Sequence, residues 1–287
     1  MQRVLVTGAR GYIGKHVIPA LLKRGADVTE LDSHGPAECE TKRIVLDIGK
    51  NDFAKVRPSD YDICLHLAWR NGFVHNDDSH ILDLSAHYSF LSHLIDGGVG
   101  KIVVMGTMHE VGYWEGEITS ETPCNPLSKY AIAKDSLRKA LEIKAVERCC
   151  KLCWLRGFYI VGDDAGSQSV FGKIVRASES GQHVFPFTSG KNKYDFISIN
   201  ALSEQIAACT LSESAEGVIN CCTGQPQTLA SRVEAFIVEQ GLDIMLEYGA
   251  YPDRPYDSPG IWGDATQINE IMLRDREILR RAGRYAK

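Results

Sequence analysis

The stretch that decides the fold is residues 3–14, R-V-L-V-T-G-A-R-G-Y-I-G. A short apolar strand, Arg3–Thr7, runs into a glycine-rich turn and then into a helix with Ile13, Val17 and Leu21 on one face. Small residues let the backbone approach a pyrophosphate, and the first turn of the helix offers free N–H groups. Strand, turn and helix together predict a dinucleotide-binding unit.

A second strand is expected at residues 28–31, and Asp32 follows it directly. A carboxylate at this point can accept both hydroxyls of an adenosine ribose and repel a 2′-phosphate, which predicts NAD as the cofactor. Arg10 in the glycine turn could instead pair with such a phosphate, so NADP stays the alternative.

Strands and helices alternate regularly up to residue 156, and after residue 157 the pattern breaks into shorter pieces. Further strands are expected at residues 43–46, 61–67, 101–107, 151–156, 194–199 and 218–221. Helices are expected at residues 81–95, 126–147, 170–180, 201–211, 229–239 and 265–286, with a proline-rich loop at residues 251–263. This order predicts an α/β fold. A Rossmann-type doubly wound parallel sheet would span residues 1–156, and a smaller, interleaved C-terminal lobe that mainly binds substrate would span residues 157–287, partly returning to the Rossmann domain.

The segment N-P-L-S-K-Y-A-I-A-K (125–134) indicates a helix with Pro126 in its first turn. Tyr130 and Lys134 are four residues apart, so both point from one face of that helix. An ammonium beside a phenol stabilises the phenolate and lowers the pKa of the tyrosine, which permits proton transfer near neutral pH. Thr107, at the end of the preceding strand, could donate a second hydrogen bond to the same substrate oxygen.

The bulk properties exclude some partners. The 287 residues carry 32 Lys and Arg against 37 Asp and Glu, for a net charge of −5. Without a basic block, neither nucleic acid nor a membrane surface is expected as the main partner, whereas an anionic small molecule is allowed. The sequence has no apolar run of membrane-spanning length and starts directly on a strand, which favours a cytoplasmic enzyme.

Nine cysteines are scattered along the chain. Cys149, Cys150 and Cys153 lie where a helix is expected to end and a strand to begin, and no Cys or His pair follows at zinc-site spacing. We therefore expect buried thiols and no metal site.

Two features near the expected strand ends allow two interpretations each. His66 could be a catalytic base, but its place in an apolar run favours a hydrogen-bonded core histidine. The tripeptide Met108-His109-Glu110 could be a substrate-recognition loop because it follows Thr107 directly. It could equally be a solvated loop with a structural histidine.

Several motifs resemble those of the extended short-chain dehydrogenase/reductases, in particular the NAD-dependent epimerase/dehydratase enzymes that act on nucleotide sugars. The matching segments are T-G-A-R-G-Y-I-G (7–14), Asp32, H-L-A (66–68), Thr107 and Y-A-I-A-K (130–134). Three more are R-G-F-Y-I-V-G (156–162), similar to the family's R-x-F-N-x-Y-G, Y-D-F-I-S-I-N (194–200), similar to R-D-F-I-x-V-D, and N-C-C-T-G (220–224), similar to N-x-G-T-G. The resemblance covers nearly the whole chain.

The resemblance implies three catalytic residues. Tyr130 would be the acid/base, Lys134 would tune it and bind the nicotinamide ribose, and Thr107 would polarise a carbonyl or bind an alkoxide. It also implies the cofactor contacts: pyrophosphate at Gly8, Gly11, Tyr12, Ile13 and Gly14, the adenosine ribose at Asp32, adenine at Asp47 and Ile48, and the ribose side at Leu67 and Ala68. Arg254 falls where the family places an arginine on the phosphates of the sugar nucleotide.

Departures from the family pattern reduce the number of reactions that the chain could catalyse. Family 4,6-dehydratases carry Asp-Glu directly after the catalytic threonine, because the elimination of water needs an extra acid and base. Met108 and His109 stand at these positions, so a dehydratase is not expected. Tyr159 replaces a common asparagine and Tyr194 replaces a phosphate-binding arginine. The expected substrate residues are therefore Met108, His109, Tyr159, Lys173 and Arg254, with Lys173 and Arg254 on the diphosphate.

Two reactions remain. A reductase would use NADH or NADPH to reduce the 4-keto group of a nucleotide-activated 6-deoxyhexose, with Tyr130 as proton donor, whereas a 4-epimerase would oxidise and re-reduce C4 with a retained NAD. The compact size and altered substrate loop resemble the reductases that make dTDP-linked 6-deoxyhexoses, such as dTDP-6-deoxy-talose reductases. Reduction is therefore favoured over epimerisation.

A third hypothesis, a non-catalytic dinucleotide-sensing protein, is disfavoured because a sensor has no need of a complete Thr/Tyr/Lys set. The family resemblance also implies a homodimer, in which the helices at residues 81–95 and 126–147 pair across a two-fold axis.

Overall fold

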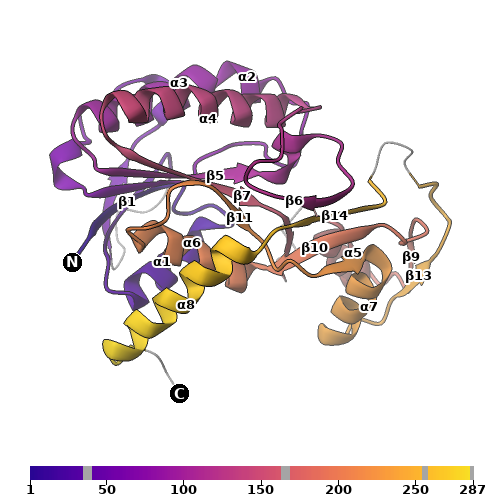
Figure 1. Cartoon of the computed structure of the whole chain (residues 1–287). Coiled ribbons are helices and arrows are strands. Elements are labelled where there is room, and N and C mark those ends of the chain that lie inside the picture. The colour runs from indigo at the N-terminus through magenta and orange to yellow at the C-terminus, as the bar shows by residue number, and fades with distance from the viewer. Residues whose placement is uncertain (35–40, 163–168, 254–257, 285–287) are drawn as a thin grey trace.

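A seven-stranded sheet forms the centre of the protein in this computed structural model, which describes residues 1–34, 41–162, 169–253 and 258–284 (Figure 1). Its strands are β1 (Arg3–Thr7), β2 (Asp27–Asp32), β3 (Lys42–Val45), β4 (Ile63–His66), β5 (Lys101–Thr107), β7 (Lys151–Gly157) and β11 (Gly217–Cys221). They lie in the order β11-β7-β5-β4-β1-β2-β3, and every neighbouring pair is parallel. The strand order reverses at β1, which is the doubly wound topology of a Rossmann-type sheet. The predicted fold class is confirmed.

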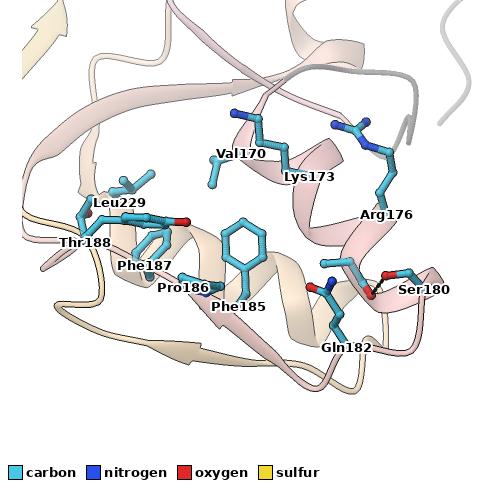
Figure 2. A pocket seen from close by; sticks show the side chains of 12 residues that line it. Val170, Lys173, Arg176, Ser180, Gln182, Phe185, Pro186, Phe187, Thr188 and Leu229 are labelled. Atoms are coloured by element: carbon cyan, nitrogen blue, oxygen red, sulfur yellow. Dashed lines mark hydrogen bonds between the residues drawn. The ribbon is translucent and has the colours of Figure 1, made fainter.

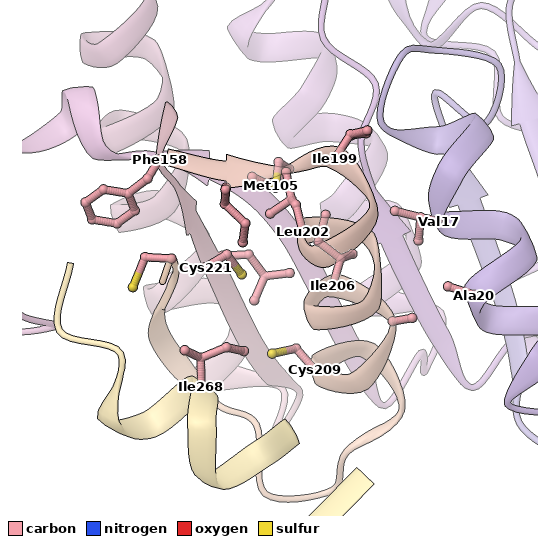
Figure 3. Close-up of a cluster of buried hydrophobic side chains, with 14 of the residues drawn as sticks. Val17, Ala20, Met105, Phe158, Ile199, Leu202, Ile206, Cys209, Cys221 and Ile268 are labelled. Carbon is pink, nitrogen blue, oxygen red and sulfur yellow. The ribbon is translucent and has the colours of Figure 1, made fainter. Parts of the chain in front are cut away.

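Helices cover both faces of this sheet (Figure 1). On one face lie α3 (Leu84–Asp96) and α4 (Lys129–Glu147), with the short α2 (Ser79–Leu82) beside α4; on the other lie α1 (Gly14–Lys23), α6 (Ile199–Leu211) and α8 (Thr266–Arg281). Each face has its own apolar core. Figure 3 shows part of the larger one, where Leu202 and Ile206 of α6 pack between the sheet and the flanking helices.

A second, smaller sheet lies beyond the carboxyl ends of the first (Figure 1). It contains β6 (Gly116–Ile118), β8 (Tyr159–Val161), β10 (Lys193–Ser198), β12 (Pro226–Thr228) and β14 (Gly260–Gly263). A two-stranded sheet of β9 (Val184–Pro186) and β13 (Met245–Glu247) lies beside α5 (Val170–Glu179) and α7 (Leu229–Glu239). Since β6 comes from the first half of the chain while β11, α6 and α8 come from the second, the chain crosses repeatedly between the sheets. The domain division at residue 157 stays a prediction.

Several predicted element boundaries are wrong, and three of the differences have a clear structural cause. The helix expected at residues 81–95 begins at Ser79 and is interrupted at Asp83, whose carboxylate pairs with Arg70. The helix expected from Pro126 begins only at Lys129, because Ser128 keeps an extended backbone and its Oγ accepts the N–H of Ala131 at 3.3 Å.

The third correction concerns the proline-rich segment at residues 251–263, which does not end as a loop. Its last four residues, Gly260–Gly263, form β14 between β10 and β6, with Ile261 buried. A strand this short is decided by partners on both sides and not by its own composition. In the part of the chain that the structure describes, no helix is long and apolar enough to cross a membrane.

Candidate active site

The glycine turn after β1 is packed so closely that no side chain fits. Gly8 has φ +65°, and a Cβ at this residue would lie 2.6 Å from the backbone nitrogen of Ala68, in the loop after β4. A Cβ at Gly14 would lie 2.5 Å from the carbonyl oxygen of Ala9 and closer still to that of Gly8. These are backbone atoms, which cannot rotate away as a side chain could. The turn therefore requires glycine at both positions.

Asp32 lies against this turn, although it comes 22 residues after Arg10 in the sequence. Its Oδ2 accepts the backbone N–H of Arg10 at 3.0 Å, so the carboxylate at the end of β2 faces the start of the glycine turn. On the side of β1 that faces β4, Thr7 accepts two hydrogen bonds from the loop after β4. Its carbonyl oxygen accepts the N–H of Leu67 at 3.1 Å, and its Oγ1 accepts the N–H of Ala68 at 3.3 Å. The carboxyl ends of β1, β2 and β4 thus converge on one edge.

The remaining cofactor candidates lie along the same edge. Tyr12 and Ile13 pack partly against the larger core, and Ile13 directly precedes α1. Asp47, after β3, is exposed and caps a single 3₁₀ turn by accepting the N–H of Gly49 at 2.9 Å; Ile48 packs against the smaller core.

Thr107 ends β5 and starts a 3₁₀ turn, η3 (Met108–Val111), through a reciprocal pair of caps. The Oγ1 of Thr107 accepts the N–H of His109 at 3.3 Å, and Oε1 of Glu110 accepts the N–H of Thr107 at 2.8 Å. Glu110 is 0% exposed and also accepts the indole N–H of Trp154, with its two oxygens each at 3.0 Å. Both sequence-based interpretations of residues 108–110 missed this capping role, although the T-x-x-E spacing of a capping box was visible, and the burial of Glu110 does not fit a solvated loop. Glu110 holds the backbone of Thr107 in place.

Lys134 is buried on α4, with 3% of its surface exposed. Its Nζ donates to the carbonyl oxygen of Met105 at 2.7 Å and lies 3.8 Å from the centroid of the Trp69 ring and 6.0 Å from that of Tyr130. Burial lowers the pKa of Lys134 to about 7, against the opposing attraction of the Glu110 carboxylate. At neutral pH the side chain is therefore poised between its ammonium and amine forms.

The pKa of Tyr130 is shifted in the direction opposite to the prediction. Burial raises it, the negative charge of Glu110 raises it further, and a hydrogen bond with Thr107 lowers it in part. Lys134 does not outweigh these effects in this arrangement, because burial disfavours the phenolate and brings a carboxylate close to it. Tyr130 holds its proton at neutral pH.

The loop after β4 adds residues that sequence analysis did not assign. The N–H of Tyr130 donates to the carbonyl of His75 at 2.9 Å, which joins this loop to the start of α4. The His75 ring stacks on the Tyr130 ring at a centroid distance of 5.4 Å, and the ring of His80 lies 5.2 Å away. The sequence signal was weak, a W-R-N-G-F-V-H segment directly after H-L-A.

His66 is a core histidine, as the favoured interpretation predicted. It is 0% exposed, and its Nδ1 lies 2.8 Å from Oγ1 of Thr7 and its Nε2 2.9 Å from Nδ1 of His87. Burial and the nearby His87 and Lys134 hold its pKa well below the usual value.

The five expected substrate residues lie in different places. His109 is partly exposed, with its ring 4.6 Å from that of His75 and 6.4 Å from that of Tyr159. Met108 is 4% exposed within the larger core. Lys173 is exposed on α5, and Arg254 lies outside the described residues. The structure brings His109 next to His75, which stacks on Tyr130, and Tyr159 next to His109; the role of His109 and Tyr159 in substrate binding stays a prediction.

A cavity of about 690 Å³ opens in the smaller lobe between α5, β9 and the start of α7 (Figure 2). Lys173 and Arg176 line it from α5, and Phe185 and Phe187 line it from the β9 side. Thr107, Tyr130 and Lys134 are not among its lining residues. A line of rings runs from Tyr159 towards α5, which lines the cavity: Tyr159 lies 5.8 Å from Phe196, which lies 5.9 Å from Phe171 in the first turn of α5.

Comparison with known proteins identifies the family. The model of the "NAD dependent epimerase/dehydratase family" matches residues 4–222. The chain belongs to this family. It is 40% identical over 267 residues to the "dTDP-6-deoxy-L-talose 4-dehydrogenase (NAD(+))" of Aggregatibacter actinomycetemcomitans, across 91% of this chain and 98% of that protein. The "dTDP-6-deoxy-L-talose 4-dehydrogenase (NAD(P)(+))" of Kitasatospora kifunensis is 26% identical over 273 residues, across 88% and 83%.

Solved structures of epimerases have the same fold. The UDP-N-acetylglucosamine 4-epimerase of Methanobrevibacter ruminantium M1 superimposes with a TM-score of 0.82 at 22% identity, across 97% of each chain. The UDP-glucose 4-epimerase of Thermotoga maritima gives a TM-score of 0.78 at 21% identity, across 98% of this chain and 99% of that one. Family membership confirms the predicted resemblance, NAD as cofactor and the class of enzyme, an NAD-dependent oxidoreductase.

The residues at the sheet edge fit the NAD of this family. The glycine turn leaves a backbone cradle that a Cβ would fill, α1 begins there without a side-chain cap among the described residues, and the Asp32 carboxylate faces the turn. The residues that could hold NAD are Gly8, Arg10, Gly11, Tyr12, Ile13, Gly14, Asp32, Asp47, Ile48, Leu67, Ala68, Tyr130 and Lys134.

A metal centre finds no support in the described parts of the chain, where no group of three or more His, Cys, Asp or Glu could hold an ion. Cys149 is exposed, whereas Cys150 and Cys153 are buried free thiols.

Proposed function

We propose that this family member reduces the 4-keto group of a dTDP-linked 6-deoxyhexose with NADH. The observation that carries the proposal is the pairing of a protonated Tyr130 with Thr107 at the end of β5. Reduction of a carbonyl needs a proton donor beside the carbonyl oxygen, and the Tyr130 phenol, hydrogen-bonded to Thr107 and protonated at neutral pH, can serve as that donor. The 40% identical relative named a dTDP-6-deoxy-L-talose 4-dehydrogenase supports this substrate, because oxidation and reduction share one transition state.

The side chains divide the reaction between them. Thr107 and Tyr130 both hydrogen-bond the C4 oxygen, which orients the carbonyl and stabilises the charge that develops on it. NADH, held by the glycine turn and Asp32, would supply the hydride for C4. Tyr130 gives its proton to the oxygen, and the resulting phenolate is stabilised by the Lys134 ammonium and regains a proton from solvent. A Lys134 pKa of about 7 suits this role, because that side chain can carry a proton and also release it.

The nucleotide of the substrate is proposed to occupy the cavity in the smaller lobe. A volume of about 690 Å³ suits a nucleotide-sized ligand, and Phe185 offers a ring face to a pyrimidine base. The cationic Lys173 lines the same cavity and would face the diphosphate, in place of the arginine that Tyr194 replaces. Arg254 stays a sequence-based prediction for the same role.

The test is NADH oxidation by the purified protein on a dTDP-4-keto-6-deoxyhexose. We expect stoichiometric loss of absorbance at the nicotinamide band, and Tyr130→Phe should lower kcat by about 10²–10⁴ because the proton donor is gone. Tyr88→Phe, on α3, is the matched control and should keep the parental rate.

Three results would contradict the proposal. Turnover by Tyr130→Phe within a few-fold of the parent would remove the catalytic assignment. Tightly bound NAD together with interconversion of two sugar nucleotides, without NADH consumption, would identify a 4-epimerase. A protein that turns over no sugar nucleotide but changes its association with a partner on binding NAD would be a sensor.

We also propose a homodimer formed through α3 and α4. The outer surface of α4 exposes the apolar side chains of Ile132, Ile143 and Val146, of which Val146 is 80% exposed. Exposed apolar groups on one helix favour burial against another chain. Light scattering after size exclusion should give twice the chain mass.

A further inference from the structure

Histidines cluster around the catalytic candidates, and three of them are used by the fold. His66 and His87 bond each other. His80 accepts the indole N–H of Trp69 on Nδ1 at 3.0 Å; because an indole N–H only donates, that nitrogen carries no proton. The proton of His80 is therefore on Nε2, which donates to the carbonyl of Val74 at 3.1 Å. Each of these imidazoles holds neighbouring elements together.

His75 and His109 differ from these three. Their rings meet edge to face at 4.6 Å, the His75 ring is stacked within 17° of parallel on the Tyr130 ring, and His109 lies two residues after Thr107. Both are partly exposed. In the described parts of the chain, no hydrogen bond is made by any ring nitrogen of these two side chains. Two unused imidazoles therefore flank the two groups proposed to bind the C4 oxygen.

The charge state of these imidazoles indicates what they can bind. Burial lowers the pKa of His75, and the nearby His80 lowers it further. Burial lowers the pKa of His109 to about 4, and the nearby His75 contributes to this shift. Both rings are neutral at neutral pH, so each offers one donor and one acceptor. Neutral imidazoles suit hydroxyl groups, which also donate and accept, and suit a phosphate less well because it needs positive charge.

We infer that His75 and His109 bind the ring hydroxyls of the sugar whose C4 reacts, and that they hold the sugar ring against Tyr130. His75 thereby becomes a specificity-determining residue contributed by the loop after β4. This inference rests on the proposed function, since it takes a sugar 4-ketone as the substrate. It adds the groups that recognise the part of the sugar next to the carbonyl.

The experiment compares the parent with His75→Phe and His109→Phe. Phenylalanine keeps a ring of similar shape for stacking on Tyr130 but removes both nitrogens. The substrates are a dTDP-4-keto-6-deoxyhexose and its analogues that lack the 2- or the 3-hydroxyl. His93→Phe on α3, whose Nε2 faces the carbonyl of Val56 at 3.3 Å, controls for the loss of an imidazole elsewhere.

We expect each site variant to raise the KM for the sugar nucleotide about two- to twelvefold, the loss of one neutral hydrogen bond. The KM for NADH and the kcat should change by less than about twofold, because the contact is made equally in ground and transition states. With the parent, an analogue that lacks the contacted hydroxyl should have a KM raised by a similar factor. With the variant that lacks the imidazole binding this hydroxyl, the same analogue should show no further rise in KM.

The outcomes separate this inference from the proposed function. A parent that oxidises no NADH with any of the three sugars overturns both. An active parent with an unchanged KM in both variants overturns only the inference, as does an equal penalty for the deoxy analogues in parent and variants. If the variants do not fold, the KM values of the parent test the inference. Equal KM values for the three sugars would contradict hydroxyl binding by these histidines.

Discussion

Lys134→Met should stabilise the folded protein while abolishing turnover, and the stabilisation should depend on pH. Lys134 is 3% exposed, and burial lowers its pKa from 10.5 to about 7. At about 1.4 kcal/mol per pKa unit, the folded state loses roughly 5 kcal/mol by carrying this ammonium at a pH below both values. Met keeps the apolar stem of the side chain and removes the charge.

The direction of this pH dependence follows from the protons bound by the folded and the unfolded chain. Between about pH 7 and pH 10.5 the unfolded chain holds the lysine proton and the folded chain does not. The free energy of unfolding of the parent therefore falls as the pH falls through this window, and below about pH 7 this group causes no further loss. The variant lacks this dependence, so its advantage grows as the pH is lowered.

Losses independent of pH oppose the gain. Met leaves the carbonyl of Met105 without the donor now at 2.7 Å and the Trp69 ring without its cation at 3.8 Å. With these costs, we expect Lys134→Met to be more stable than the parent by roughly 1–3 kcal/mol at pH 7, and less stable near pH 10.

The assay is urea unfolding followed by circular dichroism at several pH values from 6 to 10. Measuring parent and variant in parallel cancels the other titrating groups. Lys139→Met is the matched control on the same helix, because that side chain is 59% exposed and its substitution should show little pH dependence. A difference between Lys134→Met and the parent that is constant with pH, or that grows as the pH rises, would refute the reasoning.

Three further substitutions test the cofactor edge and the second sheet. Gly14→Ala should weaken NAD binding at least about tenfold, measured by fluorescence titration, because its Cβ would meet backbone atoms at 2.5 Å or less. Asp32→Ser should raise the ratio of kcat/KM with NADPH to that with NADH by about tenfold or more, because a carboxylate repels the 2′-phosphate. Asp195→Asn should lower the free energy of unfolding, measured in urea, by about 2–4 kcal/mol. The Asp195 carboxylate is 0% exposed and accepts the N–H groups of Thr223, Gly224 and Gly263. An asparagine would place its NH₂ group, which is a donor, against N–H groups that also donate.

Each of these has a control and a contrary result. Gly100→Ala places its Cβ at an ordinary 3.7 Å from the nearest atom, so parental NAD affinity is expected there; equal affinity for Gly14→Ala would contradict the account of the turn. Unchanged cofactor preference in Asp32→Ser would remove Asp32 from the ribose site. Asp243→Asn, with a side chain 94% exposed, should leave stability unchanged. The same result for Asp195→Asn would show that the hydrogen bonds of the Asp195 carboxylate do not stabilise the fold.

Local patterns in the sequence predicted much of the central sheet. The strand expected at residues 3–7 has the same bounds in the structure, and Asp32 does end β2 beside the glycine turn. These features depend on apolar runs and on conformations open only to glycine, which neighbours in sequence determine. The wrong prediction for the start of α4 has a local cause too. The Ser128 side chain caps the helix, so the helix starts after Ser128 and not at Pro126.

Contacts between distant segments were not predictable in the same way. Glu110 caps Thr107 locally, but its burial depends on Trp154 and Arg156 from β7. Likewise, nothing in residues 69–75 indicates that His75 stacks on Tyr130, because the contact exists only once the loop after β4 is joined to the start of α4.

The sequence by itself determined the fold class and the cofactor and predicted the Thr107, Tyr130 and Lys134 set, because each depends on residue type and short spacing. Only the tertiary structure decided how these groups behave. Helical spacing alone predicted that Lys134 lowers the pKa of Tyr130, whereas burial and the Glu110 carboxylate raise it and burial lowers that of Lys134. A pKa depends on every charge and on all the solvent excluded around a group, and both are set by residues that meet only when the chain has folded.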